Sequence, residues 1–197
     1  MKTIIISAYT CCGKTYLYEH WKDKCNILDS DSSKFHFEKR KRTEEELQAK
    51  KERWDAEGHL MSGESHINHI KNDLITVINP EYPNNYIRHI KDNLGVADII
   101  LVPSYLPIRQ AMDDARITYV TVYPNTLCMN EYIGRMVSRG DKESAIQFQY
   151  DYWHKFLYNI SSEPHGKEII WLKQNQYLSD VIYDIIGKFY YKYNMED

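Results

Sequence analysis

Short apolar runs alternate along the chain with longer segments in which apolar residues recur at helical spacing. Runs such as Ile4 to Ile6 and Ile99 to Val102 are continuous rather than alternating, which is typical of strands buried on both faces. The apolar runs predict strands at residues 3–7, 25–28, 97–102, 118–122 and 168–172. The pattern therefore indicates an α/β fold with a five-stranded parallel sheet and helices on both faces.

The helical spacing predicts helices at residues 14–21, 107–115, 129–139, 142–158 and 179–191. Between the second and third predicted strands, a charged helical stretch at 42–57 and a Pro- and Asn-rich segment at 79–86 interrupt the alternation. Mixed charge signs are typical of a solvated helix. We expect one domain over 1–197, with a core at about 1–34 and 95–197 and an insertion at about 35–94.

Composition and charge exclude several classes of protein. Of the 197 residues, 43% are hydrophobic and 27% charged, which is typical of a folded globular chain rather than a disordered one. A net charge of -3 gives no global attraction to duplex nucleic acid, so any such binding must be local. No apolar run approaches the roughly 20 residues that span a bilayer, and we expect no membrane contact.

The cysteines and histidines do not predict a metal centre. Cys11, Cys12, Cys25 and Cys128 lack metal-type pairing, and we interpret them as reduced thiols of a cytoplasmic protein. No Cys or carboxylate set with zinc-like spacing completes a site with the histidines at 59, 66 and 69.

The segment directly after the first predicted strand has the features of a phosphate-binding loop. It reads Ala8-Tyr9-Thr10-Cys11-Cys12-Gly13-Lys14-Thr15 and opens the first predicted helix, the context that such a loop requires. Backbone N–H groups and the positive helix end would surround phosphate oxygens, while Lys14 reaches the outer phosphates and Thr15 binds magnesium. Ala8 departs from the glycine that is usual at the first position. We expect ATP and Mg²⁺ as cofactors.

Cys11 and Cys12 allow a second interpretation of this loop. An electropositive loop lowers the pKa of a thiol, and oxidation there would inhibit the protein. The simpler interpretation is that both are small loop residues without a chemical role.

Carboxylates follow the second predicted strand, at the sheet edge where α/β proteins bind ligands. Asp29 and Asp31 stand there, two residues apart. An acid in this place orients or deprotonates an acceptor hydroxyl, or holds magnesium, because phosphoryl transfer depends on positioning and charge neutralisation. We assign Asp29 to the metal and Asp31 to the acceptor. The alternative is that they cap the following helix.

Other nucleotide-binding classes lack their signatures here. The sequence has no Asn-Lys-x-Asp, the guanine motif of small GTPases, and the third predicted strand ends in Pro103-Ser104. Motor and helicase ATPases usually carry an acidic residue at that strand end. A kinase is the class that remains.

Arginines supply candidate phosphate ligands. Arg135 and Arg139 are four residues apart in the predicted helix 129–139 and would share one face. As a lid at about 126–142 they would close over the transferring phosphoryl group; the alternative is an ordinary solvated helix. Arg109 would grip an acceptor phosphate, and Arg88 with its neighbour His89 would line the acceptor side, although both also suit a surface. The segment 173–176 would pack against adenine, or is a simple turn.

Taken together, these segments resemble the nucleoside monophosphate kinase branch of P-loop proteins, and more closely the small kinase-like ATP-binding proteins of bacteriophages and prophages. The resemblance is carried by residues 8–15, 27–33, 79–90, 98–104, 123–125, 131–140 and 176–180. It implies a five-stranded core, an acceptor-binding insertion after the second strand and an arginine-bearing lid after the fourth. The insertion does not match the acceptor motifs of adenylate, guanylate or thymidylate kinases.

The carboxylates after the second strand also look like those of polynucleotide kinases, where such an Asp acts as base toward a hydroxyl. We expect an ATP- and Mg-dependent kinase whose substrate is a nucleotide, foremost a (deoxy)nucleoside monophosphate. Phosphorylation of a hydroxyl on a nucleoside, a modified base or a nucleic-acid end is the first alternative. A non-catalytic nucleotide-binding regulatory protein is the second.

Overall fold

The computed structural model describes residues 2–56, 74–161 and 168–194. The chain divides into two compact units. One comprises Met1–Ser32 and Pro83–Asp197, and the other comprises Ser33–Tyr82.

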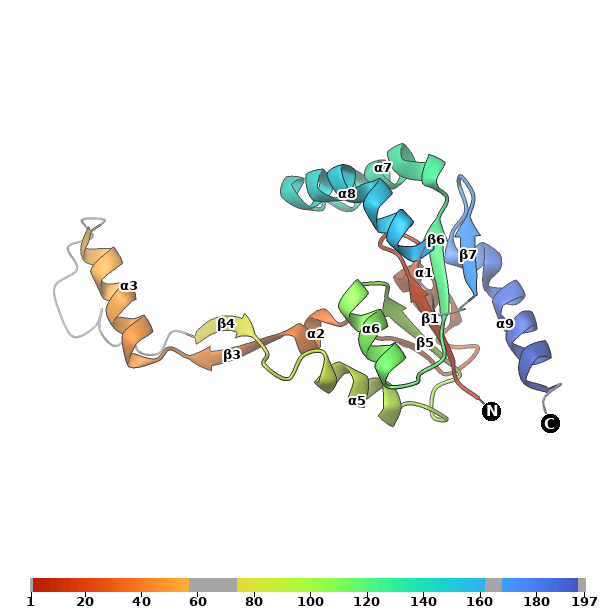
Figure 1. Ribbon diagram of the computed structural model, residues 1–197, viewed down its shortest axis with the longest axis horizontal. Coiled ribbons are helices and arrows are strands. Elements are labelled where there is room, and N and C mark those ends of the chain that lie inside the picture. Colours follow the sequence, from red (N-terminus) through yellow and green to blue (C-terminus); the bar gives the residue numbers. More distant parts are fainter. Residues whose placement is uncertain (1, 57–73, 162–167, 195–197) are drawn as a thin grey trace. The chain divides into compact units, whose positions relative to one another are not determined.

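A five-stranded sheet forms the centre of the first unit (Figure 1). Its order is β2-β5-β1-β6-β7, and all neighbours are parallel. The strands are β1 (Ile4–Ala8), β2 (Ile27–Asp29), β5 (Ile99–Pro103), β6 (Val120–Pro124) and β7 (Ile169–Leu172). The predicted parallel sheet is confirmed, with strand bounds shifted by one or two residues toward the C-terminus except at the end of β7, which is unchanged.

Helices cover both faces of this sheet, as the sequence predicts (Figure 1). Helices α1 (Lys14–Trp21) and α9 (Leu178–Asn194) lie on one face, and α5 (Asn84–Asp92) and α6 (Leu106–Asp114) lie on the other. Side chains alternate between the faces along β1: Ile4 and Ile6 join the main core, while buried Ile5 lies outside that cluster. Both layers are therefore apolar.

Helices α7 (Met129–Arg139) and α8 (Glu143–Ser161) follow β6 through a short 3₁₀ turn, Thr126–Cys128. Gly140 ends α7 in the left-handed conformation, with φ of 79°, which glycine adopts without steric cost. Trp153 of α8 is fully buried and donates from its indole N–H to the carbonyl of Thr126 at 3.0 Å. These contacts fix α8 beside the carboxyl end of β6.

The second unit contains α2 (Ser33–His36), α3 (Glu44–Ala56) and an antiparallel hairpin of β3 (Phe37–Lys41) and β4 (Leu74–Ile78). The sequence predicts the charged helix but not the hairpin. Both strands alternate between exposed and half-buried positions, although β4 is mostly apolar and β3 is mostly polar. The polar β3 does not have the apolar run that marks a buried strand. The histidines at 59, 66 and 69 lie outside the described residues.

The second unit ends at Tyr82 rather than near residue 94, so α5 belongs to the core unit. Three side chains explain this placement, because Tyr86, Ile87 and Ile90 are all buried. None of the helices in the described ranges is both long and apolar enough to span a membrane.

We expect Tyr86→Phe to destabilise the core unit. The Tyr86 side chain is fully buried, and its hydroxyl donates to the carbonyl of Ser30 at 2.8 Å, directly after β2. Removing that donor from a buried carbonyl costs about 1 to 2 kcal/mol. Urea denaturation measures the loss, and Tyr191→Phe, at a side chain 78% exposed, is the control. Equal stability of the two variants would contradict a structural role for this bond.

Candidate active site

The turn between β1 and α1 has the backbone of a tight, anion-accepting loop. Ala8 pairs with Pro103 and Val122 as the last residue of β1, so it is extended and replaces the usual glycine without strain. Cys11 and Gly13 adopt left-handed conformations, with φ of 57° and 91°. A Cβ added at Gly13 would also lie 3.3 Å from the Tyr177 ring. Glycine is therefore required at position 13 rather than at position 8.

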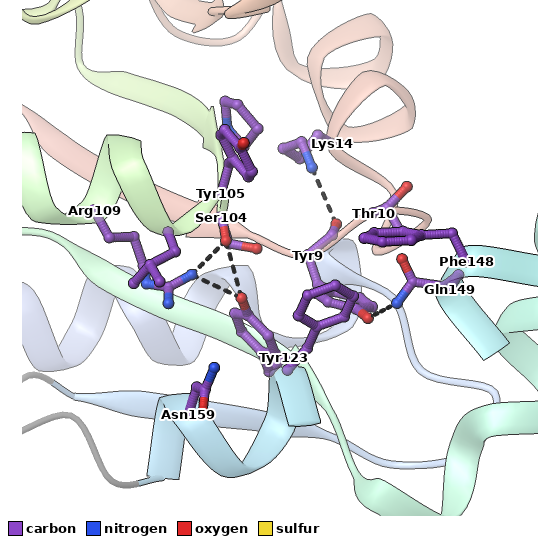
Figure 2. Close-up of a pocket in the computed structure, with 13 residues that line it drawn as sticks. Tyr9, Thr10, Lys14, Ser104, Tyr105, Arg109, Tyr123, Phe148, Gln149 and Asn159 are labelled. Atoms are coloured by element: carbon purple, nitrogen blue, oxygen red, sulfur yellow. Dashed lines mark hydrogen bonds between the residues drawn. The ribbon is translucent and has the colours of Figure 1, made fainter. Parts of the chain in front are cut away.

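Lys14 folds back over its own loop. Its Nζ donates to the carbonyl of Ala8 at 2.7 Å and to that of Tyr9 at 3.0 Å, the bond drawn in Figure 2. Desolvation lowers the pKa of this ammonium below the ordinary range of a lysine, since burial disfavours the charged form. A phosphate oxygen is a stronger acceptor than either carbonyl, so Lys14 is placed to exchange these bonds for an anion.

Thr15 and Asp29 meet at the edge of the sheet. The Thr15 hydroxyl at the start of α1 donates to Oδ2 of Asp29, the last residue of β2, at 3.0 Å. These hard oxygens suit Mg²⁺, which proteins commonly hold through one or two carboxylates together with substrate phosphates and water. No group of three or more His, Cys, Asp or Glu side chains is arranged around a metal position in the described parts of the chain. A bound Mg²⁺ would thus depend on the phosphates for further ligands.

Arg135 joins two backbone segments. Its guanidinium donates to the carbonyls of Cys11 and Gln176, each at 3.0 Å, and forms an ion pair with Glu131. The group also lies 3.8 Å from the centre of the Tyr177 ring. The sequence predicts Arg135 as a lid residue, whereas here the side chain, 11% exposed, braces the loop against the segment that follows β7.

Glu131 completes this brace, and the sequence reasoning missed it. Its two carboxylate oxygens each lie 3.0 Å from the backbone N–H of Asn175. The spacing of Glu131 and Arg135, four residues apart on one helix, is a sequence signal for their pairing. The contact with Asn175 has no such signal, because 44 residues separate the partners.

Arg139 differs from Arg135 in exposure and in partners. Its side chain is 52% exposed and pairs with Asp141, and Nη2 lies 3.3 Å from the Thr10 hydroxyl. The hydrogen bond between the pair raises the pKa of Arg139 and lowers that of Asp141. Arg139 is thus the more accessible cation at the mouth of the loop.

A cavity of about 610 Å³ lies over the loop and combines most of these residues. Its lining includes Lys14 and Thr15 from the loop side, Arg135 and Arg139 from α7, and Asn175 from the predicted adenine-packing segment. We call it the donor cavity. The remaining predicted loop residues that line it are Thr10, Cys11 and Gly13.

A second cavity of about 370 Å³ shares Thr10 and Lys14 with the donor cavity, and Figure 2 shows the residues that line it. Arg109 lines it but is only 3% exposed. Its Nη1 donates to the Ser104 carbonyl and, at 2.9 Å, to the Tyr123 hydroxyl. The sequence predicts Arg109 as a ligand of an acceptor phosphate, yet this nitrogen joins the ends of β5 and β6.

The other predicted acceptor residues lie elsewhere. Asp31 is exposed two residues beyond the end of β2, and Arg88 is exposed on α5. Neither lines the two cavities described above.

The expectation of a lowered thiol pKa is wrong for Cys12. This side chain is fully buried, with its sulfur 3.4 Å from the Tyr132 hydroxyl. Burial raises the pKa of the thiol to about 11, since desolvation of a thiolate outweighs the nearby positive charges. Cys12 is therefore a packing residue behind the loop.

Comparison with known proteins adds little to this geometry. No protein-family model matches the chain, and no curated protein matches it in sequence. Among solved structures, a gluconokinase from Sinorhizobium meliloti 1021 is similar over 97% of this chain and 97% of its own, at 12% identity and a TM-score of 0.46. At that similarity the likeness carries no argument about activity. The resemblance to phage-encoded proteins stays a prediction.

We expect Arg135→Ala to destabilise the protein and Arg139→Ala to leave its stability nearly unchanged. The first change leaves Glu131 half-buried without its cation and two carbonyls without a donor, at a cost of about 2 to 3 kcal/mol. The second removes an exposed pair, worth at most about 1 kcal/mol. Chemical denaturation compares the two variants, and equal losses would show that Arg135 is not a brace.

Proposed function

We propose that this protein is an ATP- and Mg-dependent phosphotransferase acting on a nucleotide, foremost a (deoxy)nucleoside monophosphate. The carrying observation is the position of Lys14, which lines both the donor cavity and the second cavity. A phosphoryl group held at Lys14 would be within reach of both a triphosphate in one cavity and an acceptor in the other. Phosphoryl transfer depends on such positioning of donor and acceptor.

Each residue of the site has a distinct role in this proposal. Backbone N–H groups of the loop receive phosphate oxygens, Lys14 exchanges its two carbonyl partners for the outer phosphates, and Arg139 offsets charge at the mouth. Thr15 and Asp29 hold the metal. Mg²⁺, when bound, neutralises charge on the transferring phosphates.

A hydroxyl acceptor is the second candidate, favoured by the lining of the second cavity. Apart from Lys14 and Arg109 this lining is uncharged, and Arg109 is already engaged with Ser104 and Tyr123. A neutral nucleoside suits such a lining better than a phosphate does. A base role for Asp31 requires the acceptor hydroxyl to extend from this cavity toward the end of β2, because Asp31 does not line the cavity.

Lys14→Ala is expected to reduce phosphoryl transfer by at least about 100-fold, because the transferring group loses its cation. The fold should persist, since the Lys14 ammonium is disfavoured by desolvation in the free protein. Transfer is measured with γ-labelled ATP against nucleosides, nucleoside monophosphates and DNA ends, with Lys91→Ala on the exposed side of α5 as control. Wild-type turnover in the Lys14 variant would refute the proposal. Background hydrolysis alone in the unaltered protein would favour a regulatory nucleotide-binding role.

Asp31→Asn distinguishes the two acceptor classes. A hydroxyl acceptor needs a base, so transfer should fall by about 100-fold or more, whereas a phosphate acceptor is already an anion and should show only a mild loss. The ratio of turnover on a nucleoside to turnover on its 5′-monophosphate, before and after the change, is the measurement. A large loss on the monophosphate would count against the leading candidate.

A further inference from the structure

The second cavity is walled by aromatic side chains from four parts of the core unit. It lies between the carboxyl ends of β1, β5 and β6 and one side of α8 (Figure 2). Its rings are Tyr9, Tyr105, Tyr123, Phe148 and Phe156. A cavity of about 370 Å³ whose walls are apolar and rich in aromatic rings is of the size and character that small-molecule sites have.

Two of these five rings are more than half exposed to solvent. Phe148 and Tyr105 are each 54% exposed, although they come from different elements and line the same cavity. On α8, Phe148 belongs to a ladder at four-residue spacing, with ring centres 4.7 Å from Tyr152 and 5.7 Å from Phe156. The ladder holds the Phe148 ring in place at the cavity, and a large ring so exposed is suited to contact a ligand.

Six polar side chains interrupt the apolar wall of the cavity: Thr10, Lys14, Ser104, Arg109, Gln149 and Asn159. Lys14 lies at one end and Asn159 at the other (Figure 2). Between them Gln149 already donates to the Tyr9 hydroxyl, and Arg109 to Ser104 and Tyr123. A polyol would have to turn its hydroxyls toward rings, which costs free energy for each hydroxyl left without a partner. A flat ring meets no such cost.

We propose that this cavity binds the nucleobase of the acceptor, stacked on Phe148 and Tyr105, with its edge facing the Asn159 amide. An amide has two donor hydrogens and an acceptor oxygen, so Asn159 can contact a base edge in addition to the interaction that it already makes within the protein. The reacting group of the acceptor then faces Lys14. That last point rests on the proposed function, whereas binding of the ring itself does not.

The test compares Phe148→Ala with Tyr150→Ala in the full chain. Both rings are on α8 and are similarly exposed, at 54% and 52%, but only Phe148 lines the cavity. Calorimetry measures binding of the common nucleosides and their 5′-monophosphates, with ribose 5-phosphate as the probe that lacks a base. Phe148→Ala should weaken the binding of the tightest base-containing probe by about 10-fold or more, the usual scale of base stacking. Tyr150→Ala should change it less than 2-fold.

Three results would overturn the proposal. Either no base-containing probe binds, or ribose 5-phosphate binds as tightly as the nucleotides, or Phe148→Ala and Tyr150→Ala change the affinity equally. If Phe148→Ala does not fold, Phe148→Leu replaces it, because leucine keeps the apolar surface but cannot stack. Asn159→Leu should alter the order of preference among the bases, which a purely structural role for that amide would leave unchanged.

Phosphoryl transfer measured on the same proteins separates the two proposals. Ring binding that depends on Phe148 without any transfer from Mg-ATP would refute the proposed function and support the base cavity. Transfer to a nucleotide whose KM is unaffected by Phe148→Ala would support the proposed function and overturn the base cavity.

Discussion

The site depends on a desolvated cation held by the carbonyls of its own loop. Lys14 is kept in place because Tyr9, whose carbonyl it contacts, is itself fixed: its N–H donates to Val122 at 3.0 Å, its hydroxyl accepts from Gln149, and its ring lies 4.7 Å from that of Tyr123. The left-handed backbone at Cys11 costs about 1 to 2 kcal/mol. Packing behind the loop offsets that cost, so the loop is shaped before any anion binds.

The two arginines of α7 show how burial divides one sequence feature into two roles. Arg135 is held by Glu131, Cys11 and Gln176 and ties the loop to the segment after β7. Arg139 stays exposed beside Thr10. A cation already satisfied by three partners gains little from a further anion, while an exposed one gains more. In the proposed reaction, charge neutralisation therefore depends on Lys14 and Arg139, and Arg135 maintains the geometry in which they act.

The sheet and the loop could be predicted because their signals are local: the strands of the sheet are short and mostly apolar, and the loop lies between a strand and a helix. The hairpin of β3 and β4 could not, since β3 is mostly polar and offers the apolar β4 no partner strand with a matching pattern. Long-range contacts could not be predicted either, such as the hydrogen bond between Gln149 and Tyr9, which are 140 residues apart. Burial raises the pKa of Cys12 instead of lowering it, and the buried Arg109 joins the ends of two strands. Both outcomes depend on packing between distant segments, which no local sequence pattern indicates.

Tyr9 connects the two cavities chemically as well as spatially. Its ring lines the second cavity, and its carbonyl accepts from Lys14 at the edge of the donor cavity. An ordinary phenol, with a pKa of about 10, is already neutral at physiological pH. Burial, with a smaller contribution from Tyr123, raises the pKa of the Tyr9 phenol further. A phenolate there would repel a triphosphate and attract Lys14 away from it. Keeping the phenol neutral leaves the Lys14 ammonium available to phosphate, while the same ring offers an apolar wall to a base.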